Sequence, residues 1–150
     1  MEFGFAPGAE LITIRIGEQL FAIDIMVVRE IRGWTASTPI PHTPTYVLGM
    51  INLRGAVLPV LDLAARLGLA PCHPDASSVV IVADIGSRHA GLLVDAVCDI
   101  VTLQEGMLQA PPDLGGDPVG DFVKGVITTE EGIVTLLGLD DVLPGQALAA

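Results

Sequence analysis

The sequence predicts an all-β protein with a barrel-like arrangement of strands. Three observations carry this prediction: roughly eight short segments rich in β-branched residues, frequent turn residues between them, and almost no helical periodicity. The chain has 150 residues, of which 17 are glycine and 11 are proline. A chain of this length forms one compact unit, or two very small barrels that share a core.

The N-terminal part of the chain predicts a hairpin. Isoleucine stands at every second position of residues 11–16, which indicates a strand with one buried face. Thr13 and Arg15 lie on its other face, which we expect to meet water. Gly17-Glu18 provides the turn, and residues 19–24 return as the second strand.

Residues 25–32 have a different rhythm, with apolar residues three and four positions apart. This spacing predicts a short helix with Asp24 as its N-cap. Met26, Val27 and Val28 span too wide an arc of such a helix for all three to be buried, so we expect at least one to be exposed. A proline-rich extended loop is expected to follow.

The centre of the chain predicts a second hairpin, with strands at 49–53 and 56–61 around an Arg-Gly turn. Gly55 can adopt the positive φ that a tight turn needs, whereas Arg54 would meet a steric cost there. Pro59 has no N–H for a strand ladder, so it indicates an edge, a bulge or a strand end.

After this hairpin, Asp62 suits the N-cap of a helix over residues 63–67. Residues 78–85 form a nearly continuous β-branched run and predict a buried strand, and residues 88–95 are expected to pair with it. Gly91 inside the second of these strands marks a bulge, a barrel bend or the close approach of another chain.

The C-terminal third predicts a strand over residues 97–103, in which we expect Cys98 to be a small core residue. Three further elements are expected after it: a loop over 104–121, a hairpin of 122–127 and 132–137, and a helical turn over 140–143. Residues 1–10 and 144–150 are expected to be tails around a domain of residues 11–143.

Composition narrows the classes of partner. A net charge of −11 with seven basic residues argues against nucleic acid, because a phosphate-binding face needs clustered Lys and Arg. No uncharged run approaches the roughly 18 residues of a membrane span, so we expect no membrane insertion. Two cysteines are too few for a disulfide framework, and no secretory signal is present, which indicates a cytoplasmic protein.

The sequence offers no set of catalytic or metal-binding residues. Its histidines are scattered, its serines lack the Gly-x-Ser-x-Gly context, and no phosphate-binding glycine motif occurs. Cys72-His73 beside Asp75 lacks the spacing of a structural zinc site, and Asp113, Asp117 and Asp121 lack that of a calcium loop. We therefore expect no enzyme, cofactor or small-molecule substrate. A small-ligand-binding β-barrel remains an alternative, although an aromatic content of 4% is low for a pocket.

Residues 49–63 carry a resemblance to a known family. Their pattern, Gly-x-Ile-Asn-Leu-Arg-Gly-x-Val-Leu-Pro-Val-x-Asp-Leu, resembles the signature of the CheW family, adaptors that join chemoreceptors to the histidine kinase CheA. Asp-Ile-x-x-Val-x-Glu-Ile from residue 24 and Gly-Leu-Leu-Val-Asp-x-Val from residue 91 resemble two further family segments. Gly138 departs from the family, which often has Asp or Asn there. The resemblance covers about residues 11–143 and implies two small, intertwined five-stranded β-barrels with short helical turns.

The same resemblance implies a function. It implies a non-catalytic scaffold of a chemosensory array, in which a groove between the barrels receives the hairpin tip of a receptor's cytoplasmic domain. Separate faces would meet the regulatory domain of CheA; the resemblance assigns no residues to them. An adaptor of a non-chemotaxis chemosensory pathway is the related alternative. The candidates for the receptor side, among which Val28 and Glu30 are implied to lie near the Arg-Gly turn, are Val28, Glu30, Arg54, Val79, Gly91 and Val97.

Overall fold

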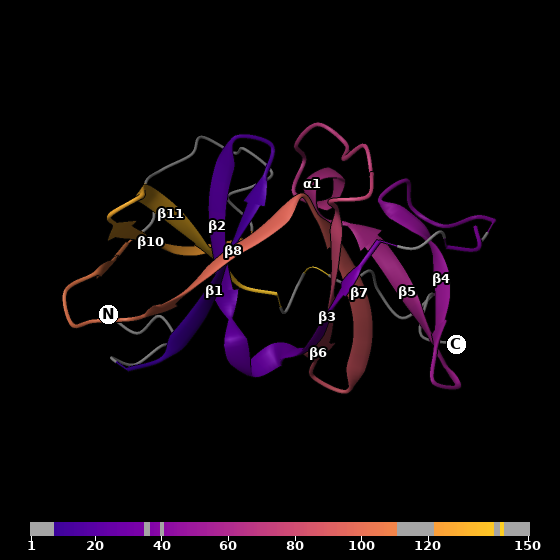
Figure 1. Cartoon of the computed structure of the whole chain (residues 1–150), viewed down its shortest axis with the longest axis horizontal. Coiled ribbons are helices and arrows are strands. Elements are labelled where there is room, and N and C mark those ends of the chain that lie inside the picture. Colours follow the sequence, from indigo (N-terminus) through magenta and orange to yellow (C-terminus); the bar gives the residue numbers. More distant parts are fainter. Residues whose placement is uncertain (1–7, 35–36, 40, 111–121, 140–141, 143–150) are drawn as a thin grey trace.

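The computed structural model describes residues 8–34, 37–39, 41–110, 122–139 and 142. Two β-sheets account for most of these residues and lie side by side along the long axis of the molecule (Figure 1). The prediction of an all-β protein is confirmed. Among the described residues no helix is long and apolar enough to cross a membrane.

The first sheet has six strands in the order β8-β1-β2-β11-β10-β9. All neighbours are antiparallel except β11 and β2, which run parallel. Its strands come from two separate parts of the chain: β1 (Glu10–Ile16), β2 (Gln19–Asp24), β8 (Ala96–Thr102), β9 (Leu108–Gln109), β10 (Val123–Thr129) and β11 (Gly132–Leu137).

The second sheet has five strands in the order β3-β6-β7-β5-β4, with β5 and β7 parallel. It is built from one continuous part of the chain, inserted between β2 and β8. Its elements are β3 (Val28–Gly33), β4 (Val47–Leu53), β5 (Ala56–Asp62), β6 (Val79–Ile85) and β7 (Arg88–Val94), together with the short helix α1 (Leu63–Arg66). The described pairings leave end strands in both sheets, so closure into barrels stays a prediction.

One hydrophobic core joins the two sheets. Ile14 and Phe21 of the first sheet belong to the same buried cluster as Leu61, Ile81 and Leu92 of the second. A smaller cluster covers the other face of the first sheet. The two sheets therefore share a core, which is one of the two arrangements that the chain length allowed.

The side chain of Arg66 links α1 to the first sheet. Its guanidinium lies over the rings of Tyr46 and Phe122, 4.7 and 4.9 Å from their centroids. Its Nε also donates a hydrogen bond of 2.6 Å to the carbonyl of Val142. This contact holds α1, the entry to β4 and the entry to β10 together.

Three local predictions need correction. Residues 25–32 are not one helix: a single 3₁₀ turn, η1 (Ile25–Val27), is followed by strand β3, which pairs with β6. Met26 is exposed, as predicted. Thr13 is buried rather than wet, because its hydroxyl bonds to the backbone of Asp99 on β8. Cys98 is exposed rather than buried, because β8 is an end strand of its sheet.

Several other predictions are confirmed or lie outside the described residues. The Asp62 side chain caps α1, and Gly68 follows with a φ of 85°. Of the predicted tails over 1–10 and 144–150, residues 1–7 and 144–150 fall outside, whereas Glu10 is the first residue of β1. Asp113, Asp117 and Asp121 and most of the turn over 140–143 also fall outside. The bounds of the domain stay a prediction.

Candidate functional site

The turn between β4 and β5 places both of its central residues in the left-handed region. The φ of Arg54 is 51° and that of Gly55 is 88°, which is the pattern of a type I′ hairpin turn. The Asn52 side chain supports the turn by accepting the Gly55 N–H at 2.9 Å. Glycine meets no steric penalty there, but a residue with a Cβ loses about 1–2 kcal/mol. Arg54 therefore has a strained backbone conformation, which the sequence analysis expected only for Gly55.

The guanidinium of Arg54 reaches from this turn to strand β3. Its Nη2 lies 2.6 Å from Oε1 of Glu30, and Nη1 of Arg32 lies 3.7 Å from Oε2 of the same carboxylate. The Arg54 side chain is 71% exposed and that of Glu30 26% exposed. The predicted proximity of Glu30 to the turn is present in the structure, although Glu30 lies on a strand and not on a helix.

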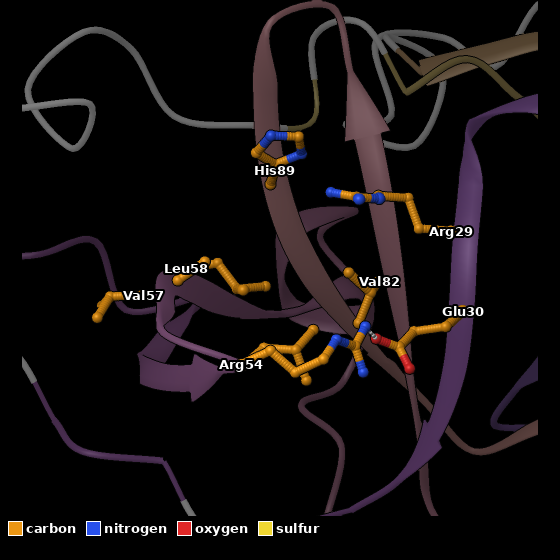
Figure 2. Close-up of a pocket in the computed structure, with 9 residues that line it drawn as sticks. Arg29, Glu30, Arg54, Val57, Leu58, Val82 and His89 are labelled. Carbon is orange, nitrogen blue, oxygen red and sulfur yellow. Dashed lines mark hydrogen bonds and ion pairs between the residues drawn. The ribbon is translucent and has the colours of Figure 1, made fainter.

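A pocket of about 280 Å³ opens beside this ion pair (Figure 2). Arg54 and Glu30 meet at one side of it, whereas Arg29 and His89 lie at the other, with Val82 between them (Figure 2). Residues from β3, the β4–β5 hairpin, β6 and β7 line it: Arg29, Glu30, Leu53, Arg54, Ala56, Val57, Leu58, Val82 and His89. All five strands of the second sheet thus meet at one hollow, whose lining mixes charged and apolar side chains.

A second group of charges borders the same pocket. Nε of Arg29 lies 3.5 Å from Oδ2 of Asp84, and Nδ1 of His89 contacts the other oxygen of that carboxylate. Arg29, Arg32 and Arg54 are three of the seven basic residues in the chain. The surroundings of the pocket are therefore rich in cations on a protein whose net charge is −11.

The apolar candidates do not line this pocket, and among them is Val28, which the resemblance implied to lie near the Arg-Gly turn. Val28, Val79 and Val97 are half-buried and pack against the core cluster that joins the sheets. Val28 and Val79 belong to the paired strands β3 and β6, whereas Val97 comes from β8 of the first sheet. The three valines therefore come from both sheets and contact the same core.

Gly91 is buried in the middle of β7 and is not accessible to a partner at the surface. A Cβ at this position would lie 2.8 Å from Cγ1 of Val80 and 3.5 Å from Cγ2 of Val60. These close neighbours are side chains of the same sheet and not another chain, and the pairing of β7 with β6 has no bulge at Gly91. The structure brings together Arg54 and Glu30, and places Gly91 beneath the surface.

Sequence reasoning missed Arg29, His89 and Val57 as members of the pocket. Val57 is 61% exposed although it lies in an apolar strand. A strand assignment for residues 28–33 would have put Arg29 in an extended segment, but the pairing of that segment with β6 and its register shift at Arg29 are not local features.

Among the described residues no group of three or more His, Cys, Asp or Glu side chains is arranged to hold a metal ion. What the site presents is an exposed guanidinium and a hollow lined by both charged and apolar residues. This arrangement suits recognition of another protein.

Comparison with known proteins identifies the family. Residues 10–146 match the family model described as CheW-like domain. The chain belongs to the CheW family. Chemotaxis protein CheW of Rhizobium meliloti (strain 1021) is 51% identical over 139 residues, which cover 93% of this chain and 90% of that protein. Probable chemotaxis protein CheW of Rhizobium etli is 50% identical over 131 residues, covering 87% and 84%.

A solved structure agrees with this membership. The crystal structure of scaffolding protein TtCheW from Thermoanaerobacter tengcongensis matches with a TM-score of 0.84 at 30% identity, over 93% of this chain and 94% of that one. The resemblance read from residues 49–63 is therefore confirmed as CheW-family membership, and the fold as that of a CheW protein.

Proposed function

We propose that this CheW-family protein is a non-catalytic cytoplasmic adaptor that couples chemoreceptors to the histidine kinase CheA in a chemosensory array. Its relatives carry the name chemotaxis protein CheW, and its structural neighbour is described as a scaffolding protein. These names favour a chemotaxis pathway over another chemosensory output. The receptor contributes the hairpin tip of its cytoplasmic domain, and CheA its regulatory domain.

The observation that carries the proposal is the conformation of Arg54. Strained backbone positions concentrate at functional sites, where a requirement other than stability maintains them. The ion pair of Arg54 with Glu30 is too exposed to repay the strain, since exposed pairs contribute about 0–1 kcal/mol. Arginine at this turn is therefore explained by a partner that binds its guanidinium.

The receptor side comprises Val28, Glu30, Arg54, Val79, Gly91 and Val97. Arg54 and Glu30 supply the polar contacts at the rim of the pocket, and the three half-buried valines supply apolar area. Gly91 acts indirectly, because its missing side chain lets β5, β6 and β7 pack closely beneath the pocket. The kinase binds elsewhere on the protein, on surfaces for which no residues are assigned.

A binding pocket for a small ligand accounts less well for the site. Pockets for such ligands are mostly apolar and measure roughly 300–1,000 Å³. The hollow beside Arg54 is about 280 Å³ and is bordered by two groups of ion pairs. Incubation with ATP and CheA should leave phosphate on the kinase and none stably on this protein.

Calorimetric titration with a receptor hairpin fragment tests the receptor side. Arg54→Ala should weaken binding by about 1–3 kcal/mol, or roughly 5–150-fold, because a partly desolvated guanidinium is lost. Arg15→Ala removes an exposed arginine of the first sheet and is the matched control, with affinity unchanged. Glu30→Arg should also weaken binding, and Arg54→Glu combined with it should restore part of the loss. Unchanged affinity of Arg54→Ala would remove Arg54 from the site.

A further inference from the structure

Asp95 is the only residue between the two sheets where the chain returns from the second to the first. β7 ends at Val94 and β8 begins at Ala96. The backbone N–H of Asp95 donates to the carbonyl of Arg15 on β1 at 3.1 Å. The backbone at Asp95 is thus hydrogen-bonded to the first sheet.

The carboxylate of Asp95 bonds to both parts of the molecule. Its Oδ2 accepts the backbone N–H of Gly17, in the turn between β1 and β2, at 2.6 Å. Its Oδ1 accepts the thiol of Cys72, in the loop that follows α1, at 3.2 Å. One side chain therefore connects an element of the first sheet to an element of the second.

The Cys72 end of this connection is itself anchored. The Cys72 N–H donates to Oδ2 of Asp62 at 2.9 Å, and Asp62 is the N-cap of α1. Burial, followed by the hydrogen bond and the charge of Asp95, raises the pKa of the Cys72 thiol to about 12. The thiol therefore keeps its proton and remains a hydrogen-bond donor at neutral pH.

The position of this connection matters for the receptor residues. Val97 follows Asp95 by two residues on β8, whereas Val28 and Val79 belong to the second sheet. All three pack against the core that the sheets share. A change in the angle between the sheets would move Val97 relative to the other two valines.

We propose that Asp95 is a positioning residue for receptor binding, because its carboxylate joins the β1–β2 turn to the loop after α1 and fixes the angle between the two sheets. The receptor part of this inference rests on the proposed function. Arg66 and the common core also join the sheets, so loss of the Asp95 bridge changes their relative orientation rather than unfolding the protein.

The angle between the sheets is measured between spin labels at Glu131→Cys, in the β10–β11 turn, and Ser87→Cys, in the β6–β7 turn. Both positions are exposed. Cys98→Ser and Cys72→Ser remove the native thiols, and a serine at 72 keeps a donor for Asp95. Asp95→Ala should broaden or shift the distance distribution. Cys72→Ala should have the same effect, because it removes the donor and leaves Asp95 intact. This variant provides the test if Asp95→Ala does not fold.

Two matched variants separate bridging from charge. Asp95→Asn removes the charge but keeps both ends of the bridge, because its oxygen can accept the Gly17 N–H and its NH2 can donate to the side chain at position 72, so it should retain the native distance. Asp99→Ala removes a carboxylate from the same strand without touching the bridge. Receptor affinity should follow the distances, falling about fivefold in Asp95→Ala and Cys72→Ala and staying within about twofold in the two controls.

The distance and affinity measurements distinguish failure of the bridge from failure of the proposed function. Distance distributions that stay native in both Asp95→Ala and Cys72→Ala overturn the bridge, whatever happens to binding. A receptor fragment that does not bind even the wild-type protein overturns the proposed function, and with it the receptor part of this inference, while the distances still decide the bridge. Altered distances with unchanged receptor affinity overturn the positioning role.

Discussion

Arg54 combines a strained backbone with a side chain that contributes little to the folded state. Its φ of 51° favours glycine, and its guanidinium is largely exposed in its pair with Glu30. Arg54→Gly should therefore raise the free energy of unfolding by about 1 kcal/mol relative to Arg54→Ala, because glycine removes the strain that alanine retains. Both variants should lose receptor affinity alike. Urea unfolding beside calorimetric titration measures the two effects, and an Arg54→Gly protein less stable than Arg54→Ala would contradict the strain.

Asp62 should make stability depend on pH in a defined direction. Burial raises the pKa of this carboxyl above its usual 3.8, against the opposing hydrogen bonds from Cys72, Ala65 and Ala64. The folded state thus binds the proton at a higher pH than the unfolded chain. The resulting stabilisation is complete below pH 3.8 and is lost as the pH rises through the folded value.

The matched variant for this effect is Asp62→Asn, which keeps the capping oxygen and cannot titrate. As the pH falls from 7 to 4, the free energy of unfolding of the wild type should rise relative to that of Asp62→Asn. Urea titrations at several pH values measure this difference. A difference that stays constant, or that moves in favour of the variant, would show that the Asp62 pKa is not raised by folding.

The conformation of these residues could be predicted from the sequence only where it depends on neighbours in the chain. The cap at Asp62 and the positive φ of Gly55 depend on residues adjacent in the chain, so both were predictable. The positive φ of Arg54 was not, because intrinsic preference argues against it and only the two-residue turn between paired strands imposes it. The pair with Glu30 was located by family resemblance, not by residue physics.

At the level of elements, β3 shows where periodicity fails. Residues 25–32 contain apolar residues at helical spacing, but short apolar runs do not distinguish a helix from a strand. Pairing with β6 decides the outcome, since Ile31 then faces outward with 46% exposure while Val28 contacts the core. Cys98 was misplaced for a related reason, because the sequence does not reveal that β8 ends its sheet.

The packing around β7 predicts the effect of filling Gly91. Gly91→Ala should lower the free energy of unfolding by about 1–3 kcal/mol, because the new methyl would lie 2.8 Å from the buried Val80 side chain. Gly33→Ala is the control: a methyl there meets no heavy atom within 4 Å, and its effect should stay within about 0.5 kcal/mol. Combining Gly91→Ala with Val80→Ala should cost less than the sum of the two, as measured by urea unfolding. Strict additivity would contradict the clash.

For the whole molecule, the sequence predicted the approximate bounds of the strands other than β3 and β9, but not how the strands assemble. The parallel pairs β2–β11 and β5–β7 join segments that are distant in the chain. The register between such segments depends on packing in the shared core, and this packing cannot be predicted from local sequence patterns. The candidate site has the same character, since Glu30, Arg54 and His89 come from three separate hairpins or strands that only the sheet order brings to one pocket.

The central claim is that one protein holds a receptor and CheA together on different surfaces. Co-sedimentation of CheA with receptor-containing membrane vesicles tests it directly. CheA should sediment with the vesicles when the wild-type protein is present and much less when it is absent. Arg54→Ala should lower the amount of sedimented CheA while binding CheA in solution within a few fold of wild type. Sedimentation of CheA that is independent of this protein would contradict the claim, as would equal loss of both partners in a folded Arg54→Ala protein.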